Sequence, residues 1–126
     1  MSRTLLTAFN NILIKFVAEL IETYPQENTF RVLKAIISLM KKVNPRKVLH
    51  IFMKNVAPYK KRLLHRDETF FLNENYSAIM EDSSNKKDAW QLMSKLKLYW
   101  KYTSQENKNV IWNYFKILLT LAEKIQ

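Results

Sequence analysis

The chain of 126 residues contains no cysteine, no glycine and only three prolines. Without cysteine there can be no disulfide, no zinc ribbon, no iron–sulfur cluster and no thiol nucleophile. Without glycine there is no Walker-type phosphate loop, no dinucleotide-binding fingerprint and no glycine-flanked nucleophile elbow. These absences exclude several common enzyme classes. The hydrophobic share, 48%, is that of an ordinary globular chain.

Long uninterrupted hydrophobic runs are also missing. The most apolar stretch lies near the N-terminus and is interrupted by Asn10, Asn11 and Lys15. We therefore expect neither a signal peptide nor a transmembrane segment. The expected molecule is a single domain spanning residues 1–126, with an intracellular, cytoplasmic location.

Hydrophobic residues recur at helical spacing along most of the chain, and no sustained alternation typical of strands is present. The pattern is strongest over Thr4–Thr23 and is ended by Pro25. The helices expected are Thr4–Thr23, Thr29–Val43, Pro45–Val56, Tyr59–Arg66, Lys87–Tyr102 and Ser104–Lys124, with short turns at Glu68–Leu72 and Tyr76–Met80 and a mobile polar loop at about 81–87. The sequence thus predicts an all-α bundle of about four long helices plus short connecting ones.

Several local features can be predicted in more detail. Asn44 is expected to cap the helix that begins at Pro45, and Thr103 with Glu106 fits a capping box. Of the adjacent Phe70 and Phe71, only one is expected in the core, because neighbours on a helix point in different directions. The remaining residues expected to face the core include Val43, the three tryptophans Trp90, Trp100 and Trp112, and a final-helix stripe of Val110, Ile111, Tyr114, Leu118, Leu121 and Ile125, widened by Phe115 and Leu119.

Positive charge is concentrated in one quarter of the chain. The formal net charge is +10, yet residues 31–66 alone hold eleven Lys or Arg and no Asp or Glu. The basic residues are Arg31, Lys34, Lys41, Lys42, Arg46, Lys47, Lys54, Lys60, Lys61, Arg62 and Arg66. Charge placed only for solubility would mix the two signs, so this basic segment favours a surface that binds a polyanion.

Such a surface predicts a non-enzymatic protein that binds nucleic acid, DNA or RNA, through phosphate contacts without strong sequence readout. Tyr59, which lies among cations, could stack on a base. Residues 44–47 could also begin the second helix of a helix-turn-helix, although the usual glycine of that turn is absent. The alternatives are a merely solvated face, or a helical adaptor whose basic face docks on an acidic protein. Whether the chain forms a homo-oligomer is left open.

Candidate catalytic and metal-binding groups are few. His50 and His65 lie among cations, which disfavours a metal ion. Asp67, just ahead of Glu68, is typical of a helix N-cap rather than of a catalytic acid. No catalytic residue, metal ligand or cofactor is therefore predicted.

Two segments resemble a pattern in small, uncharacterised helical proteins of large nucleocytoplasmic DNA viruses. The first is residues 58–71, with a Pro-Tyr step, a basic turn and an Asp-Glu-x-Phe-Phe run, and the second is the Ile-Trp-x-Tyr helix at residues 110–115. The resemblance implies a viral protein that acts in replication or packaging in a cytoplasmic virus factory. It carries over no catalytic residue. Under the adaptor alternative, the protein would be a virion component or a host-factor binder.

Overall fold

The computed structural model describes residues 2–72 and 91–125, and every regular element in these ranges is helical. The elements are α1 (Ser2–Thr23), α2 (Asn28–Val43), α3 (Pro45–Asn55), η1 (Ala57–Tyr59), α4 (Lys60–Leu64), α5 (Glu68–Leu72), α7 (Leu92–Tyr99), η2 (Trp100–Tyr102) and α8 (Gln105–Ile125). The all-α prediction is confirmed. The predicted turn at Tyr76–Met80, the loop at 81–87 and Trp90 lie outside the described residues.

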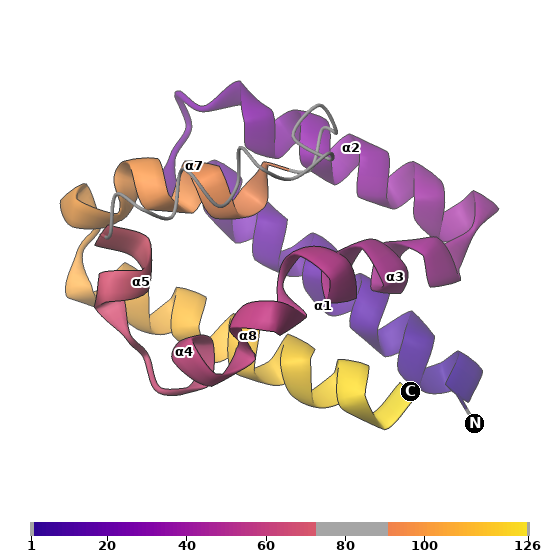
Figure 1. Cartoon of the computed structure of the whole chain (residues 1–126). Helices are drawn as coiled ribbons and strands as arrows, with labels where there is room; N and C mark the ends of the chain where they lie inside the picture. The colour runs from indigo at the N-terminus through magenta and orange to yellow at the C-terminus, as the bar shows by residue number, and fades with distance from the viewer. Residues whose placement is uncertain (1, 73–90, 126) are drawn as a thin grey trace.

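Helix α1 is central to the bundle because it contacts α2, α3 and α8, and in Figure 1 it lies behind α3, between α2 and α8. Its stripe of apolar residues faces these three neighbours, and Phe9, Leu13, Phe16 and Val17 have no exposed surface. Phe9 packs edge-on against Phe52 of α3. The periodicity of this segment therefore reflects burial of one face, while the opposite face, with Asn11, Lys15 and Glu19, is exposed.

By length and composition, residues Thr4–Thr23 of α1 would also suffice to cross a membrane. The core helix of a soluble protein and a signal sequence pass the same test, so length and composition alone do not distinguish these cases. The absence of a membrane-spanning segment stays a prediction.

The turn between α2 and α3 is a single residue. Asn44 occupies the N-cap position of α3, as predicted, but its side chain makes no capping hydrogen bond. Its carbonyl accepts the N–H of Lys47 at 3.0 Å. From α1, the fully buried Asn10 donates its Nδ2 to the carbonyl of Pro45 at 3.3 Å. This contact fixes the start of α3 to the central helix.

Aromatic rings fill the space between α5, η2 and α8. Phe71 stacks on Trp100, with ring centroids 4.4 Å apart, and also lies against Trp112 and Phe115. Phe70 is equally buried and contacts Phe71 edge-on. The expectation that only one of the two phenylalanines is buried was wrong, because the short helix α5 is enclosed on two sides.

The residues expected to face the core on α8 are buried or half-buried with the exception of Val110, and Ala122 adds to them. The core residues of α8 are Ile111, Trp112, Phe115, Leu118, Leu119, Ala122 and Ile125. The aromatic pair Trp112 and Phe115 lies at the centre of this face, whereas Val110 is 36% exposed. The inward assignment of Val43 on α2 was also wrong, because that side chain is 75% exposed.

The cap of α8 lies one residue later than predicted. Ser104, not Thr103, accepts the N–H of Asn107, at 3.1 Å. The hydroxyl of Thr103 instead bonds to the hydroxyl of Tyr24, at 2.5 Å, and donates to the carbonyl of Tyr99. The capping box was therefore wrong, and Thr103 joins the end of α1 to the start of α8.

Candidate nucleic-acid interface

The outer side of α3 carries a cluster of cations. At about 100° per residue, Arg46, Lys47, His50 and Lys54 fall within about 100° of one another, on the side opposite the buried Val48 and Phe52. All four are exposed. We refer to these four residues as the α3 cationic face.

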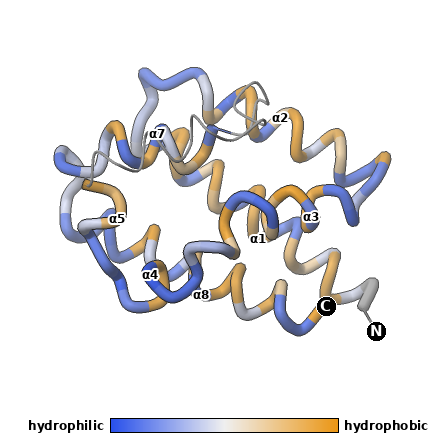
Figure 2. Tube along the Cα trace, viewed as in Figure 1, coloured by the Kyte–Doolittle hydropathy of each residue, from blue (hydrophilic) through white to orange (hydrophobic). Residues whose placement is uncertain are grey.

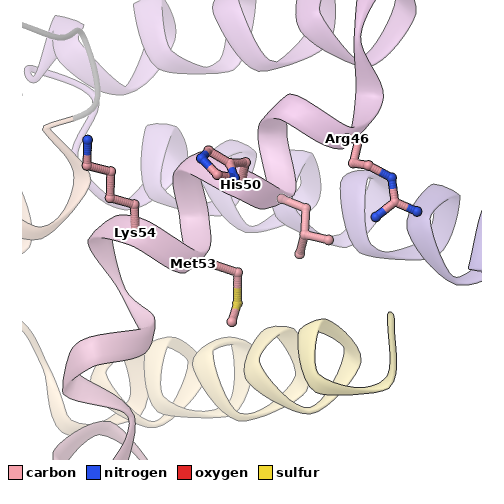
Figure 3. Close-up of a pocket in the computed structure, with 5 residues that line it drawn as sticks. Arg46, His50, Met53 and Lys54 are labelled. Carbon is pink, nitrogen blue, oxygen red and sulfur yellow. The ribbon is translucent and has the colours of Figure 1, made fainter. Parts of the chain in front are cut away.

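The α3 cationic face runs along an open hollow. Its lining is Arg46, Leu49, His50, Met53 and Lys54, around a volume of about 570 Å³. Figure 3 shows Arg46 and Lys54 at opposite ends of the helix, His50 between them, and Met53 directed toward α8. From Arg46 to Lys54 is about 12 Å along the helix axis, so these cations could follow an extended anionic chain.

The α2–α3 turn brings two more lysines to the start of α3. Lys41 and Lys42 lie in the last turn of α2, and Figure 2 shows hydrophilic residues on both sides of this turn. Lys42 is exposed and has no described partner, whereas Lys41 donates to the side-chain oxygen of Asn11 at 2.5 Å. The N-terminus of α3, where the helix dipole is positive, lies at this same turn.

The cations of α4 are partly neutralised by carboxylates from elsewhere in the chain. Lys60 forms an ion pair with Glu123 of α8, and Arg62 pairs with Asp67 at 3.0 Å. Hydrogen bonds from Thr69 and then from Arg62 lower the pKa of Asp67, which keeps this carboxyl ionised. Of the α4 cations, only Lys61 is exposed without a described partner.

Asp67 also performs the capping role that the sequence predicted for it. Its Oδ1 accepts the N–H of Thr69, at 3.1 Å, in the first turn of α5. The neighbouring Glu68 pairs with Lys108 of α8 and accepts a hydrogen bond from Trp100, and these two contacts lower its pKa. Both carboxylates thus serve helix capping and packing.

Arg66 is held against α8. Its guanidinium donates to the side-chain oxygens of Asn109, at 3.3 Å, and Asn113, at 2.8 Å. Its φ is 54°, the one positive value among the described residues. With no glycine available, an arginine makes this left-handed turn, and its hydrogen bonds to α8 offset part of the cost.

The two basic residues in the first half of α2 lie away from the α3 cationic face. Arg31 donates to the carbonyl of Pro25 at 2.7 Å, near the start of the helix, and Lys34 is half-buried one turn later. Tyr59 is also half-buried, and its ring packs on Phe70 at 4.8 Å. Of the eleven cations, Arg31, Lys41, Lys60, Arg62 and Arg66 thus have polar partners among the described residues.

Other chemistry is limited in the part of the chain that the structure describes. It contains no group of three His, Asp or Glu side chains that could hold a metal ion. His65 is exposed at the end of α4, and His50 belongs to the α3 cationic face. The sequence does not identify Leu49 and Met53 as lining the hollow, because apolar residues on an amphipathic helix are typical of the core.

Comparisons with family models, with curated proteins and with solved structures find no match to this chain. The resemblance to viral proteins therefore stays a prediction.

Proposed function

We propose that this protein binds nucleic acid through the α3 cationic face, with Lys42 and Lys61 contributing from the neighbouring helices. The observation that carries the proposal is that exposed cations of α3 have no ion-pair partner in the part of the chain that the structure describes. Arg46, Lys47 and Lys54 form no ion pair with any described residue, whereas Lys60 and Arg62 do. Cations left unpaired on one helix face are typical of a phosphate-binding surface.

The proposed contacts are to phosphates. Arginine and lysine side chains on a solvent-exposed helix neutralise phosphates and release counterions, which gives affinity without reading the bases. Five cations, Lys42, Arg46, Lys47, Lys54 and Lys61, are exposed in this region. If all five engage duplex DNA, the logarithm of affinity falls against the logarithm of salt concentration with a slope of about −4 to −5.

The test is a salt titration of binding by fluorescence anisotropy, with a labelled 20-base-pair DNA duplex and with single-stranded DNA and RNA of the same length. The test variant carries Arg46→Gln, Lys47→Gln and Lys54→Gln. The control variant carries Lys101→Gln, Lys116→Gln and Lys124→Gln, which are exposed positions outside the basic segment. Both variants lose three positive charges, so only the location of the charge differs.

We expect the test variant to lose about three units of the duplex slope and most of its affinity at 0.1 M salt. The control variant should keep a slope near that of the unsubstituted protein. Equal effects of the two variants would mean that net charge alone drives binding, and would overturn the proposed surface. Absence of binding to all three probes at low salt would overturn nucleic-acid binding itself.

A further inference from the structure

The outer side of α2 exposes a line of aliphatic side chains. Val32 is 43% exposed, Leu39 64% and Val43 75%, and the half-buried Ile36 lies between the first two. Single exposed aliphatic residues are normal on protein surfaces, but several in line on one helix form a contiguous patch. We refer to these four residues as the α2 outer stripe.

The α2 outer stripe is separate from the face that holds α2 in the fold. Phe30, Leu33 and Ile37 are buried on the opposite side of the helix, which contacts α1 and α3. At about 100° per residue, these residues lie at least about 80° from any fully exposed member of the stripe. Packing among the described helices therefore does not explain why positions 32, 39 and 43 carry the apolar residues Val32, Leu39 and Val43.

The spacing of the stripe is that of a helix-pairing seam. Successive members are four, three and four residues apart, which is the alternation of the two apolar positions in a coiled-coil heptad. The β-branched Ile36 and Val43 occupy one of these positions, and Leu39 occupies the other. A second helix laid along α2 could therefore insert its own apolar side chains between them.

The charge beside the stripe indicates what kind of helix would fit. Arg31 and Lys42 are exposed within about 100° of the stripe, and α2 contains no Asp or Glu. A partner helix with carboxylates next to its apolar positions would meet these cations across the seam. A second copy of this chain would bring the same cations together, and a net charge of +10 opposes such pairing.

We propose that the α2 outer stripe docks a helix of a partner protein, and that this helix carries an apolar heptad stripe flanked by Asp or Glu. An anionic membrane would meet the same cations, but the strength of interfacial binding scales with the apolar area inserted. Three exposed aliphatic side chains offer little such area, whereas a partner helix adds its own stripe to the contact. Docking on α2 is separate from the proposed nucleic-acid binding, because it does not use the α3 cationic face and shares only Lys42 with that surface.

A designed peptide can serve as the probe. It has three heptads with Ile and Leu at the two apolar positions and Glu at the flanking positions, where like charges also oppose its self-association. Two further peptides act as references: one with Lys in place of every Glu, and one with the same composition but shuffled apolar positions. Binding to the full chain is measured by fluorescence anisotropy of each labelled peptide.

The variants separate the α2 outer stripe from other surfaces. Leu39→Gln with Val43→Gln removes the two most exposed members of the stripe. Leu98→Gln with Ile117→Gln changes two comparably exposed aliphatic residues, 57% and 44%, on α7 and α8. A third variant, Lys42→Glu, reverses one flanking charge without altering the stripe.

We expect the Glu peptide to bind the unsubstituted chain at least tenfold more tightly than either reference peptide. The Leu39/Val43 variant should lose at least tenfold in affinity, Lys42→Glu should lose several-fold, and the Leu98/Ile117 variant should bind as the unsubstituted chain does. Equal binding of the Glu and shuffled peptides, or no effect at Leu39 and Val43, would overturn the proposal. Stripe-dependent sedimentation with phosphatidylserine vesicles, in place of peptide binding, would also overturn it and assign the face to membranes.

Discussion

Glu27 is a carboxylate whose contribution to stability should depend on pH. It precedes α2 and its Oε2 accepts the N–H of Thr29 at 3.2 Å, while its Oε1 accepts the hydroxyl of Tyr99 at 2.6 Å. Lys95 adds an ion pair at 3.6 Å. Hydrogen bonds from Thr29 and Tyr99, with a smaller effect of the Lys95 charge, lower the pKa of Glu27 from 4.5 to about 2.

The size of the effect follows from this difference. One pH unit of displacement corresponds to about 1.4 kcal/mol, so the ionised form could stabilise the fold by about 3 kcal/mol. The side chain is 13% exposed, so little of this is lost to solvent screening. Glutamine at this position keeps an oxygen acceptor, so we expect Glu27→Gln to lower the free energy of unfolding at pH 7 by about 2 kcal/mol.

The sign of the pH dependence is fixed by the direction of the shift. Because the folded-state pKa is lowered, the stabilisation is complete above the unfolded-state value of 4.5 and is lost as pH falls toward about 2. At pH 3 we expect less than half of the difference between the unsubstituted protein and Glu27→Gln to remain.

Urea unfolding at pH 7 and pH 3 provides the measurement, followed by circular dichroism. Glu22→Gln is the control, since Glu22 is exposed on α1, and it should change the free energy of unfolding by less than about 0.5 kcal/mol. A Glu27→Gln effect of the same size at both pH values would refute the role assigned to the ionised carboxylate.

Three further substitutions test packing and buried polar contacts by urea unfolding at pH 7. Asn10→Asp places a carboxylate at a site with no exposed surface, whose amide oxygen has no hydrogen-bond donor among the described residues, and should cost at least about 3 kcal/mol. The exposed Asn11→Asp should change stability by less than about 0.5 kcal/mol, and a comparable loss at both positions would contradict this reasoning. Phe71→Ala removes the ring at the centre of the aromatic contacts and should cost about 3–5 kcal/mol; a loss below about 1 kcal/mol would show that the rings repack. Thr103→Val leaves the buried Tyr24 hydroxyl without its partner and should cost about 1–3 kcal/mol, part of which Tyr24→Phe should recover in the same chain.

The helices could be predicted from the sequence because apolar periodicity and the prolines define them locally. The helix boundaries at Pro25, Asn44 and Pro58 depend on local backbone geometry, so they can be predicted without knowing the fold. The exposure of Val110 and the burial of Ala122 on α8 could not be predicted, because the final position of its core face depends on residues such as Phe71 and Trp100 packing from distant segments. An apolar helix can present several faces, and tertiary contacts select among them.

The candidate site, too, could be predicted from the sequence only in part. The excess of charge is evident in the sequence, but the partners of individual cations are not. Lys60 pairs with Glu123, 63 positions later, and Arg66 reaches Asn113 on the same distant helix. The α2 outer stripe could not be recognised in the sequence, because the helical periodicity assigned Val43 to the core face.

The central position of α1 has a consequence for synthesis on the ribosome. Helices α1, α2 and α3 are contiguous in sequence, so they can pair as soon as they have emerged. Phe16 of α1, however, packs on Tyr114 and Phe115 of α8, which are translated about 100 residues later. Until then one side of α1, together with Phe71, has no covering helix, and this interval is when the nascent chain most exposes apolar surface to chaperones.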